Sequence, residues 1–401
     1  MEVRPGYKQT EVGVIPEDWN PDYIENFAVI TTGSKNTQDR IEDGEYPFFV
    51  RSQTVERINS YSFDGEAVLT AGDGVGTGKV FHYINGRFDV HQRVYRISNF
   101  AERVNGFFFY LYFSTHFFNR IMQMTAKSSV DSVRRDMIAR MLVPLPPTEA
   151  EQRAIAQALS NMDALLGALD RLIAKKRDLK QAVMQQLLTG QTRLPGFRGE
   201  WKNTNLGKII SRFSTGLNPR QNFRLNDGGN FFYVTIKNFT VGQLLLDDGC
   251  DLIDEAAFLT INQRSDLRKD DILFSSIGRV GDAYLIPETP RNWNINESVF
   301  TLRPDKTQVV PLMLFYLLTN KALKDALDQG VTGSTFKSIK QAQLKVIPCR
   351  LPTSHEEQTA IAETLRDMDA ELAKLEHRRG KTRDLKQGMM QELLTGRNRL
   401  I

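Results

Sequence analysis

Apolar residues recur along two stretches of the chain with the spacing of one helix face. In the first stretch, from Thr148 to about Leu188, they are separated alternately by four and three residues. This heptad spacing is typical of a helix that packs along another helix. The same spacing returns near the end of the chain. The predicted seam consists of Ile155, Leu159, Met162, Leu166 and Leu169 in the first stretch and Ile361, Leu365, Met368, Leu372 and Leu375 in the second.

The two stretches are copies of one segment. Residues 151–194 align with residues 357–400 without a gap, and 25 of the 44 positions are identical. Each copy predicts a helix of roughly 40 residues, or about 60 Å at ~1.5 Å per residue. Two such helices with matching seams can bury each other, which a single amphipathic helix in water cannot do.

The ends of both helices are marked by residues that stop a helix. Prolines before each copy exclude a helix upstream, and Gly190 and Gly396 are placed as carboxyl-terminal caps. Towards those caps we expect the apolar stripe to resume at Leu179, Val183 and Leu187 and, in the second copy, at Leu385, Met389 and Leu393.

The segment between the helices decides how they run relative to each other. Roughly 160 residues should fold into a globule about 40 Å across. A parallel pair would require this globule to return the chain by ~60 Å, whereas an antiparallel pair needs no return. We therefore expect two antiparallel helices with a globular domain at each end.

The sequence outside the helices predicts an α+β fold, with two globular domains of mixed strands and short helices. Strand-like runs occur at Tyr46–Arg51, Ala67–Thr70, Val90–Ile97, Phe231–Lys237, Asp271–Phe274 and Val299–Leu302, and helical stretches at Phe107–Met124 and Leu312–Asp328. Short echoes such as Thr32 with Gly33 and Thr215 with Gly216 indicate that the domains are distant copies too. The predicted division is 1–147 (first domain), 148–194 (first helix), 195–351 (second domain) and 352–401 (second helix).

The ends of the chain suggest a cyclic arrangement. The first helix is followed by Arg193–Phe197, whereas the chain stops soon after the second helix at Ile401 and begins near Pro5 and Gly6. A segment like the one that follows the first helix is thus missing after the second helix and is found at the start of the chain. We expect a pseudo-twofold arrangement in which the termini meet.

Composition sets the class of protein. The 52 Lys and Arg residues exceed the 48 Asp and Glu residues only slightly, with a net charge of +4, so a polyanion would have to bind to local basic patches. Cys250 and Cys349 form no metal-type spacing and fit a reducing compartment. With no long apolar run and no signal-peptide core, we expect a soluble cytoplasmic protein.

Motifs of catalysis are weak or missing. The glycine-rich run Gly72–Lys79 lacks the spacing of a phosphate-binding loop, so we interpret it as a tight turn between strands. Asn20–Tyr23 departs from the Asn-Pro-Pro-Tyr tetrad of amino-methyltransferases by an Asp in place of the second proline. The sequence offers no metal cluster and no nucleophile elbow, and it predicts a protein without catalytic activity.

The helix ends carry a resemblance to a known family. Pro146 with Glu151 and Gln152, and Pro352 with Glu357 and Gln358, precede or open the two helices, and Leu188–Phe197 (LTGQTRLPGF) closes the first. With the order domain, helix, domain, helix, the chain resembles the specificity subunit of type I restriction-modification systems over its full length.

The resemblance implies a role in reading DNA. In that family two target-recognition domains each bind half of a split DNA site, and the paired helices act as a spacer and dock two modification subunits, which restriction subunits join. S-adenosylmethionine, ATP and Mg²⁺ would then belong to the partner subunits, and none of them to this chain. Half-sites on one DNA face lie about one turn apart, ~34 to 36 Å, so helix length would act as a ruler. Because the domains differ in sequence, the two half-sites should differ as well.

DNA contacts are expected from polar and basic side chains on loops, because Arg, Lys, Asn and Gln read base edges and hydroxyl groups bind phosphates. The segments just before a short predicted helix in each domain are the most favoured. An exposed cation also serves solubility alone, so each residue has that alternative. The candidates are Lys35, Asn36, Arg51, Lys79, Gln92, Arg93, Lys127, Ser128, Ser132, Arg134 and Arg135 in the first domain and Asn218, Arg220, Lys237, Asn238, Arg279, Ser334, Lys337 and Lys340 in the second.

Two other functions remain open. The chain could be a non-enzymatic coiled-coil scaffold whose end domains bind proteins, and binding to duplex DNA that weakens steeply with salt separates this from DNA recognition. It could also be a methyltransferase in its own right, which would require the isolated chain to bind the methyl donor.

Overall fold

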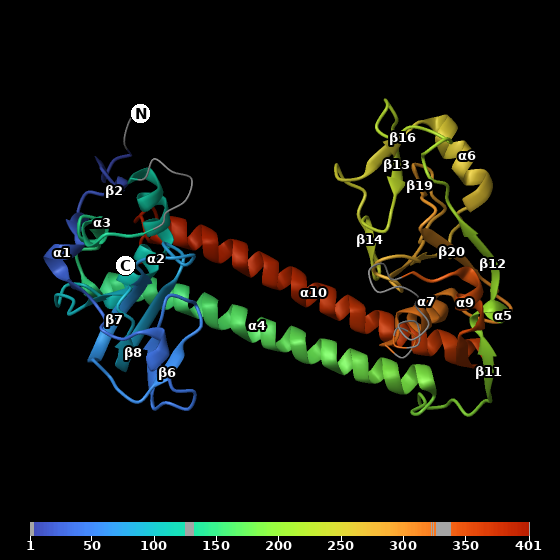
Figure 1. Ribbon diagram of the computed structural model, residues 1–401, viewed down its shortest axis with the longest axis horizontal. Coiled ribbons are helices and arrows are strands. Elements are labelled where there is room, and N and C mark those ends of the chain that lie inside the picture. Colours follow the sequence, from blue (N-terminus) through green and yellow to red (C-terminus); the bar gives the residue numbers. More distant parts are fainter. Residues whose placement is uncertain (1–3, 125–131, 322, 324, 326–337, 401) are drawn as a thin grey trace. The chain divides into compact units, whose positions relative to one another are not determined.

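The chain folds into two compact units that share its two long helices. The computed structural model describes residues 4–124, 132–321, 323, 325 and 338–400. Unit 1 consists of Met1–Asp170 and His377–Ile401, and unit 2 of Arg171–Glu376. Helix α4 (Glu149–Thr189) and helix α10 (His355–Leu393), both labelled in Figure 1, therefore each contribute one segment to each unit. The predicted helices of roughly 40 residues are confirmed.

Unit 1 is built on a six-stranded mixed sheet. Its neighbours pair in antiparallel fashion except β5 and β8, which run parallel. In spatial order the strands are β4 (Val29–Thr32), β9 (Val94–Ser98), β7 (Phe63–Ala71), β8 (Phe81–Val90), β5 (Tyr46–Phe49) and β6 (Glu56–Ile58).

Two short ladders and four helices complete the described part of this domain. The ladders are β1 (Tyr7–Thr10) with β2 (Gly13–Pro16) and β3 (Asn20–Tyr23) with β10 (Leu142–Leu145). The helices are α1 (Ile24–Phe27), the 3-10 helix η1 (Thr37–Asp39), α2 (Gly106–Met124) and α3 (Arg135–Ala139). Buried aromatic rings of α2, among them Phe108 and Phe113, form the core with Trp19 and with Ile155 of α4.

Unit 2 repeats this plan, with shorter counterparts of β7 and β8. Its four-stranded sheet has the order β12 (Ile210–Thr215), β20 (Val299–Pro304), β17 (Ile272–Ser275) and β18 (Ala283–Leu285). A second sheet has the order β16 (Asp251–Ile253), β13 (Phe231–Val234) and β19 (Trp293–Ile295). The remaining elements of the described residues are β11 (Trp201–Asn205) with β21 (Pro348–Pro352), β14 (Phe239–Thr240) with β15 (Gln243–Leu244), and the helices α5 (Leu206–Ile209), α6 (Glu255–Ser265), α7 (Pro311–Thr319) and α9 (Gln341–Val346).

The strand pairings confirm that the two domains are copies. The order β4-β9-β7-β8 of unit 1 corresponds to β12-β20-β17-β18 of unit 2. The parallel pair β5 and β8 corresponds to the parallel pair β13 and β19. Some predicted elements were wrong in extent. The run Val90–Ile97 is two strands separated by a turn at residues 91–93, and α7, within the helical stretch predicted at Leu312–Asp328, ends at Thr319.

A glycine at the same place in each domain shows how similar the local structure of the two domains is. A Cβ on Gly33 would lie 1.8 Å from the carbonyl oxygen of Val90, and a Cβ on Gly216 would lie 1.6 Å from that of Ile295. No side chain fits at either position, because backbone cannot move aside as a flexible side chain can. The echo of Thr-Gly in the sequence therefore marks a shared close approach of two backbone segments.

Within each unit the two helix segments run antiparallel, as predicted. In unit 1, Asp163 and Asp170 of α4 pair with Lys386 and Arg379 of α10, the former at 2.6 Å. In unit 2, Lys176 pairs with Glu371 at 2.7 Å and Lys180 pairs with Asp369. In both of these sets of pairs the partner number on α10 falls as the residue number on α4 rises, which defines the direction of the helices.

The seam is buried at its ends by the domains as well as by the other helix. Ile155 and Leu159 belong to the core of unit 1, and Ile361 and Leu365 belong to that of unit 2. Leu169 and Leu372 are also buried, whereas the seam residues Met162, Leu166, Met368 and Leu375 are half-buried. The ends of each helix are thus parts of globular cores.

One part of the predicted stripe was wrong. Leu179 and Leu385 are 48% and 58% exposed, although Leu187 and Leu393 further along are buried. Around Leu179 the face towards the other helix carries Lys176 and Lys180, which pair with acids of α10. Ion pairs occupy the contact that apolar spacing had assigned to leucine.

The duplicated residues at the helix starts make the same contacts in both units. Buried Gln152 accepts a hydrogen bond from the backbone N–H of Asn105, which precedes α2, and buried Gln358 accepts one from that of Val310, which precedes α7, both at 2.8 Å. Each side-chain amide also donates to two backbone carbonyl oxygens, one before the main helix of the domain and one before the long helix. Each long helix is thereby joined to the main helix of its domain.

Beside each glutamine a buried carboxylate binds the arginine that follows the other helix. Glu151 accepts two hydrogen bonds of 2.8 Å from Arg399, and Glu357 accepts two from Arg193. Arg399 also pairs with Asp18, and the hydroxyl of Tyr7 donates to backbone near Gly396. The two ends of the chain therefore meet inside unit 1, as the sequence predicted.

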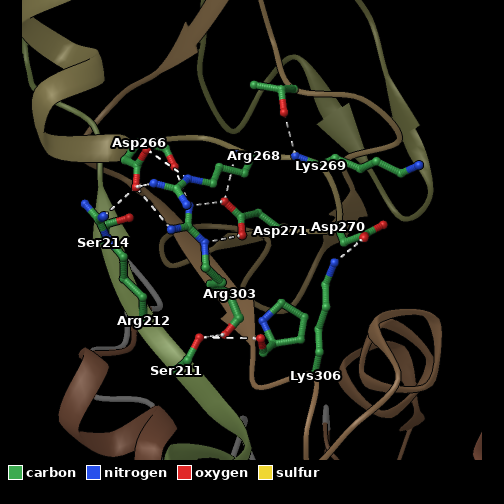
Figure 2. A network of polar contacts seen from close by, with 12 residues as sticks. Ser211, Arg212, Ser214, Asp266, Arg268, Lys269, Asp270, Asp271, Arg303 and Lys306 are labelled. Atoms are coloured by element: carbon green, nitrogen blue, oxygen red, sulfur yellow. Dashed lines mark hydrogen bonds and ion pairs between the residues drawn. The ribbon is translucent and has the colours of Figure 1, made fainter.

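Unit 2 contains a network of arginines and aspartates that links β20, β12 and the end of α6 (Figure 2). Arg303 of β20 forms two hydrogen bonds of 2.8 Å to buried Asp271, which precedes β17. It also reaches Asp266, the left-handed residue that caps α6, and Arg212 of β12 bonds to that same carboxylate at 2.6 Å. The network fastens the end of α6 to three neighbouring segments.

Candidate nucleic-acid interface

The turn between β7 and β8 carries the candidate site of unit 1. The glycine-rich run lies between Ala71, where β7 ends, and Phe81, where β8 begins, so its interpretation as a turn is confirmed. Gly74 and Gly78 have φ values of +83° and +68°, which a residue with a side chain rarely adopts. The N–H of Thr77 donates to the carbonyl of Gly74 at 3.0 Å and closes the turn.

Two arginines converge on one carboxylate in this turn. Nη1 of Arg51 lies 2.8 Å from Oδ1 of Asp73, and Nη1 of Arg93 lies 3.4 Å from Oδ2. Arg51 follows β5 and Arg93 belongs to the turn between β8 and β9. Their side chains stay 45% and 63% exposed, so both guanidinium groups keep donors directed to solvent, and a guanidinium fork suits phosphate and guanine.

The neighbouring turns bring in further predicted residues. Lys35 pairs with His91 in an isolated bridge, and the N–H of Gln92 donates to the carbonyl of Lys35 at 2.8 Å. The side-chain amide of Gln92 donates to that of Asn36 at 2.5 Å. The structure thus brings together the predicted Lys35, Asn36, Arg51, Gln92 and Arg93.

His91 is buried in the middle of these cations. Burial lowers the pKa of its imidazole, and the charges of Arg51 and Arg93 lower it further, although Asp73 opposes them. The ring is therefore neutral at pH 7, which allows its Nδ1 to accept a hydrogen bond of 2.9 Å from the N–H of Arg93. A neutral histidine here holds the turn without adding charge.

The segment before α3 closes the other side of the site. Ser132 pairs with Asp73 in an antiparallel bridge, and the N–H of Val133 donates to the carbonyl of Gly72 at 2.7 Å. The predicted Arg134 and Arg135 follow directly and are exposed. Lys79 lies over the ring of Phe118 at 5.5 Å. The predicted Lys127 and Ser128 lie outside the described residues.

Unit 2 has the same frame around the turn between β17 and β18. Ile277 pairs with Ser338 in an antiparallel bridge, and the N–H of Ile339 donates to the carbonyl of Ser276 at 2.9 Å. Gly278, with a φ of +71°, occupies the place of Gly74. Lys340 follows and is exposed. The predicted Ser334 and Lys337 lie outside the described residues.

The predicted Arg279, Lys237 and Asn238 lie together in unit 2. The guanidinium of Arg279 donates to the carbonyls of Ile236 and Phe239 at 2.8 and 2.9 Å and pairs with Asp282. Lys237, inside the turn that Arg279 binds, is exposed. Asn238 is only 8% exposed, and its amide bonds to Thr235 and to Sγ of Cys250. Asn238 therefore shapes the turn from inside.

Asn218 and Arg220 lie on the loop that follows β12, beyond Gly216. The carbonyl of Asn218 accepts a hydrogen bond from the amide of Asn222 at 2.9 Å, and Arg220 is exposed. This loop is the counterpart of the one that carries Lys35. Among the described residues, Arg220 and the turn of Arg279 are not joined by a hydrogen bond or an ion pair.

Sequence reasoning missed Asp73 and His91. An acidic residue is not expected on a surface for a polyanion, and a single histidine carries no pattern. Asp73 stands within the glycine-rich run, and only its position between two cationic turns reveals its role. That position depends on pairing between strands that are distant in sequence.

The described part of the chain contains neither a helix that could span a membrane nor a cluster of side chains that could form a metal site. No helix there is both long enough and apolar enough to cross a bilayer. No group of three or more His, Cys, Asp or Glu side chains there could hold a metal ion.

Comparison with known proteins matches the chain to a protein family. A family model for the "Type I restriction modification DNA specificity domain" matches residues 16–175 and 198–382, so each globular domain is matched together with part of a long helix. The two matches together cover most of the chain.

Individual relatives agree with this match. Over 197 residues the chain is 27% identical to the type I restriction enzyme EcoDI specificity subunit of Escherichia coli, an alignment of 48% of this chain and 42% of that one. Over 414 residues it is 22% identical to the type I restriction enzyme MjaVIII specificity subunit of Methanocaldococcus jannaschii, covering 96% and 94%. The crystal structure of the S subunit of a type-I restriction-modification system from M. genitalium has the same fold, with a TM-score of 0.62, 16% identity and 98% of each chain covered.

Proposed function

Because the chain belongs to the family of type I restriction-modification DNA specificity domains, we propose that each of its globular domains binds one half of a split duplex DNA site. The surface of unit 1 that contacts DNA is formed by Lys35, Asn36, Arg51, Gln92, Arg93, Ser132, Arg134 and Arg135 around the turn of Asp73. The surface of unit 2 is formed by Lys237, Arg279, Ser338 and Lys340 around the turn of Gly278, with Asn218 and Arg220 on the adjacent loop.

The observation that carries the proposal is the convergence of cations and amides on equivalent turns of two domains. Arg51 and Arg93 come from loops far apart in sequence and meet at Asp73, and Lys35 joins the neighbouring turn at His91. The turn of Gly278 carries Arg279, which binds the turn of Lys237, and its bridge from Ile277 to Ser338 matches the bridge from Asp73 to Ser132. A solvated surface would not require this gathering twice, whereas reading one duplex at two places does.

The long helices support the second part of the proposal, which concerns partners. Duplicated ion pairs of α4 and α10 are made by residues identical in both copies, such as Asp163 with Lys386 and Asp369 with Lys180. Equivalent surfaces suit two copies of one partner. We assign these surfaces to two modification subunits, joined by restriction subunits, and we assign S-adenosylmethionine, ATP and Mg²⁺ to those subunits. The chain itself acts as a non-catalytic recognition subunit.

The helices also give the proposed site its geometry. α4 is 41 residues long, or about 60 Å at ~1.5 Å per residue, and this length sets the gap between the half-sites. The two turns carry different side chains, so the two half-sites differ and the site is asymmetric.

The test is DNA binding by the chain assembled with its modification subunits. The binding constant should fall steeply with salt, and Arg51→Ala and Arg93→Ala should each lower the slope of log K against log salt by about one contact. Arg103→Ala is the matched control, because Arg103 is 53% exposed and paired with Asp22 away from the turn. Binding that does not depend on salt would favour the protein-interaction scaffold.

Methylation in the host provides the second readout. Sequencing the methylated bases of the host with and without this gene should reveal one bipartite motif that depends on the gene. Binding of S-adenosylmethionine by the purified chain alone would instead favour an independent methyltransferase.

A further inference from the structure

Val75 at the tip of the turn of Asp73 is fully exposed, at 100%. The next most exposed large apolar side chain among the described residues is Val346, at 71%. An apolar side chain gains nothing from complete exposure, because burial of apolar surface is what stabilises a fold. Its position therefore needs a reason outside the folding of this domain.

The turn holds Val75 outward on a firm base. A Cβ on Gly76 would lie 2.7 Å from the carbonyl of Arg51, and one on Gly78 would lie 2.4 Å from a methyl group of Ile121. The glycines thus rest against the domain, and the hydroxyl of Thr77 donates to the carbonyl of Gly74 at 2.6 Å. Because the turn is packed on one side, Val75 is the residue that it presents on the other.

The surroundings of Val75 favour DNA as the occupant. Arg51 contacts the turn directly, since a Cβ on Gly74 would lie 3.8 Å from its Nη1, and Arg51 and Arg93 both bind Asp73 two residues before Val75. Guanidinium groups around an apolar tip suit a duplex in which phosphates and one apolar group are close together. The C5-methyl group of thymine is the apolar group in the major groove.

On this basis we propose that Val75 contacts the methyl group of a thymine in the half-site bound by unit 1. Wedges that open a base step are longer side chains such as Phe, Leu, Ile or Met, and the two methyl groups of valine are too short for that. The inference rests on the proposed function, because it names one specificity-determining residue within it.

The equivalent position of unit 2 carries a different side chain. Arg279 follows Gly278 just as Val75 follows Gly74, and both glycines have positive φ values two residues after equivalent hydrogen bonds. Arg279 is bound back to the carbonyls of Ile236 and Phe239. One frame thus presents an apolar group in unit 1 and a cation in unit 2, so a thymine contact is expected from unit 1 alone.

The experiment removes the methyl group from either side of the contact. The chain is assembled with its modification subunits, and its site is read from the bases that the complex methylates. Each thymine of that site is then replaced by uracil, which lacks only the methyl group. One replacement should weaken binding by about four-fold, the equivalent of burying one CH₂ group.

Val75→Ala should weaken binding to the thymine duplex by a similar factor and should make that uracil replacement silent. Val75→Thr, which keeps one methyl group, should retain part of the effect. Val29→Ala is the control. Val29 is also an exposed valine, at 47%, but it lies at the start of β4, whereas the loop of Lys35 follows the end of that strand. All three variants change exposed side chains and should unfold at the temperature of the parent chain.

The outcomes separate the inference from the proposed function. If no uracil replacement loses its effect in Val75→Ala, or if the site contains no thymine, Val75 does not contact a thymine methyl group, although DNA recognition would stand. If the assembled complex neither binds nor methylates any bipartite site, the proposed function itself fails.

Discussion

Asp73 is an acid on a surface proposed to bind a polyanion, and its contacts explain its presence. Ion pairs between exposed groups contribute little to stability, typically below about 1 kcal/mol, so the pairs with Arg51 and Arg93 do little to hold the fold. They do restrict two long side chains that would otherwise sample many conformations. We interpret Asp73 as a positioning residue for the two arginines.

Asp73→Asn should therefore separate affinity from specificity. The variant loses a charge that repels phosphates, so binding to unrelated duplex DNA should strengthen. It also frees the two guanidinium groups, so the ratio of specific to non-specific affinity should fall. Competition titrations at fixed salt measure both quantities, and the free energy of unfolding should change by less than about 1 kcal/mol. An unchanged ratio would show that the pairs do not position the arginines.

At the scale of single residues, the sequence indicates which residue types could bind DNA, but it does not indicate which of their side chains face solvent. Lys237 and Asn238 are neighbours and equally plausible readers of DNA, yet Lys237 is exposed and Asn238 is buried against Thr235 and Cys250. Which of the two faces solvent depends on the hydrogen bonds of a turn, and no spacing rule encodes that choice.

The long helices were the most predictable elements, because each needs only a local pattern and each is written twice. The same local pattern failed at Leu179 and Leu385, because Lys176 and Lys180 meet acids that lie on the other helix. Strand order was not predictable either. The parallel pairing of β5 with β8 joins residues about 40 positions apart, which no periodicity reveals.

Gly380 offers a direct test at the scale of the helix. It lies within α10, and a Cβ at this position would meet nothing within 4 Å. Gly380→Ala should therefore raise the free energy of unfolding by about 1 kcal/mol, the difference in helix propensity. Gly216→Ala is the opposite case, because its Cβ would overlap the carbonyl of Ile295, and it should destabilise by several-fold more. Urea denaturation of both variants checks the pair, and a destabilised Gly380→Ala would mean that the glycine has a structural role.

The network that holds the end of α6 through Asp266 predicts that the stability of the protein depends on pH. Burial acts to raise the pKa of Asp266, but the hydrogen bonds and charges of Arg303 and Arg268 outweigh it and hold that pKa below its usual range. A carboxyl group with a lowered folded pKa stabilises the fold above its unfolded pKa of about 3.9, and this stabilisation is lost as pH falls through the folded value.

Asp266→Asn should therefore destabilise the protein clearly at pH 7 and much less near pH 3. The measurement is the urea midpoint of both proteins at the two pH values. Asp227→Asn serves as the control, because Asp227 is an exposed acid of unit 2 whose nearest cation is 3.8 Å away. A difference between parent and variant that is equal at both pH values would contradict the role of Asp266.

For the whole molecule, the interleaving of the two units is the property with the widest consequence. A cut at Gly196 leaves residues 1–196 with most of unit 1 and the α4 segment of unit 2, and residues 197–401 with most of unit 2 and the α10 segment of unit 1. Leu187 and Leu188 belong to the core of unit 2, and Leu393 and Leu394 belong to the core of unit 1. Each fragment therefore completes the core of the unit that it mostly lacks.

Co-expressed fragments 1–196 and 197–401 should consequently form a stable one-to-one complex. Four leucines buried between fragments contribute roughly 1.5 to 3 kcal/mol each, and the pairs of Glu151 with Arg399 and Glu357 with Arg193 would be restored across the cut. Replacing Leu188 and Leu394 by alanine should weaken association by several orders of magnitude, whereas the exposed Leu179→Ala should not. Sedimentation of mixed fragments measures this directly. Fragments that remain separate at high concentration would show that continuity of the chain, and not the shared cores, holds the two units in their fold.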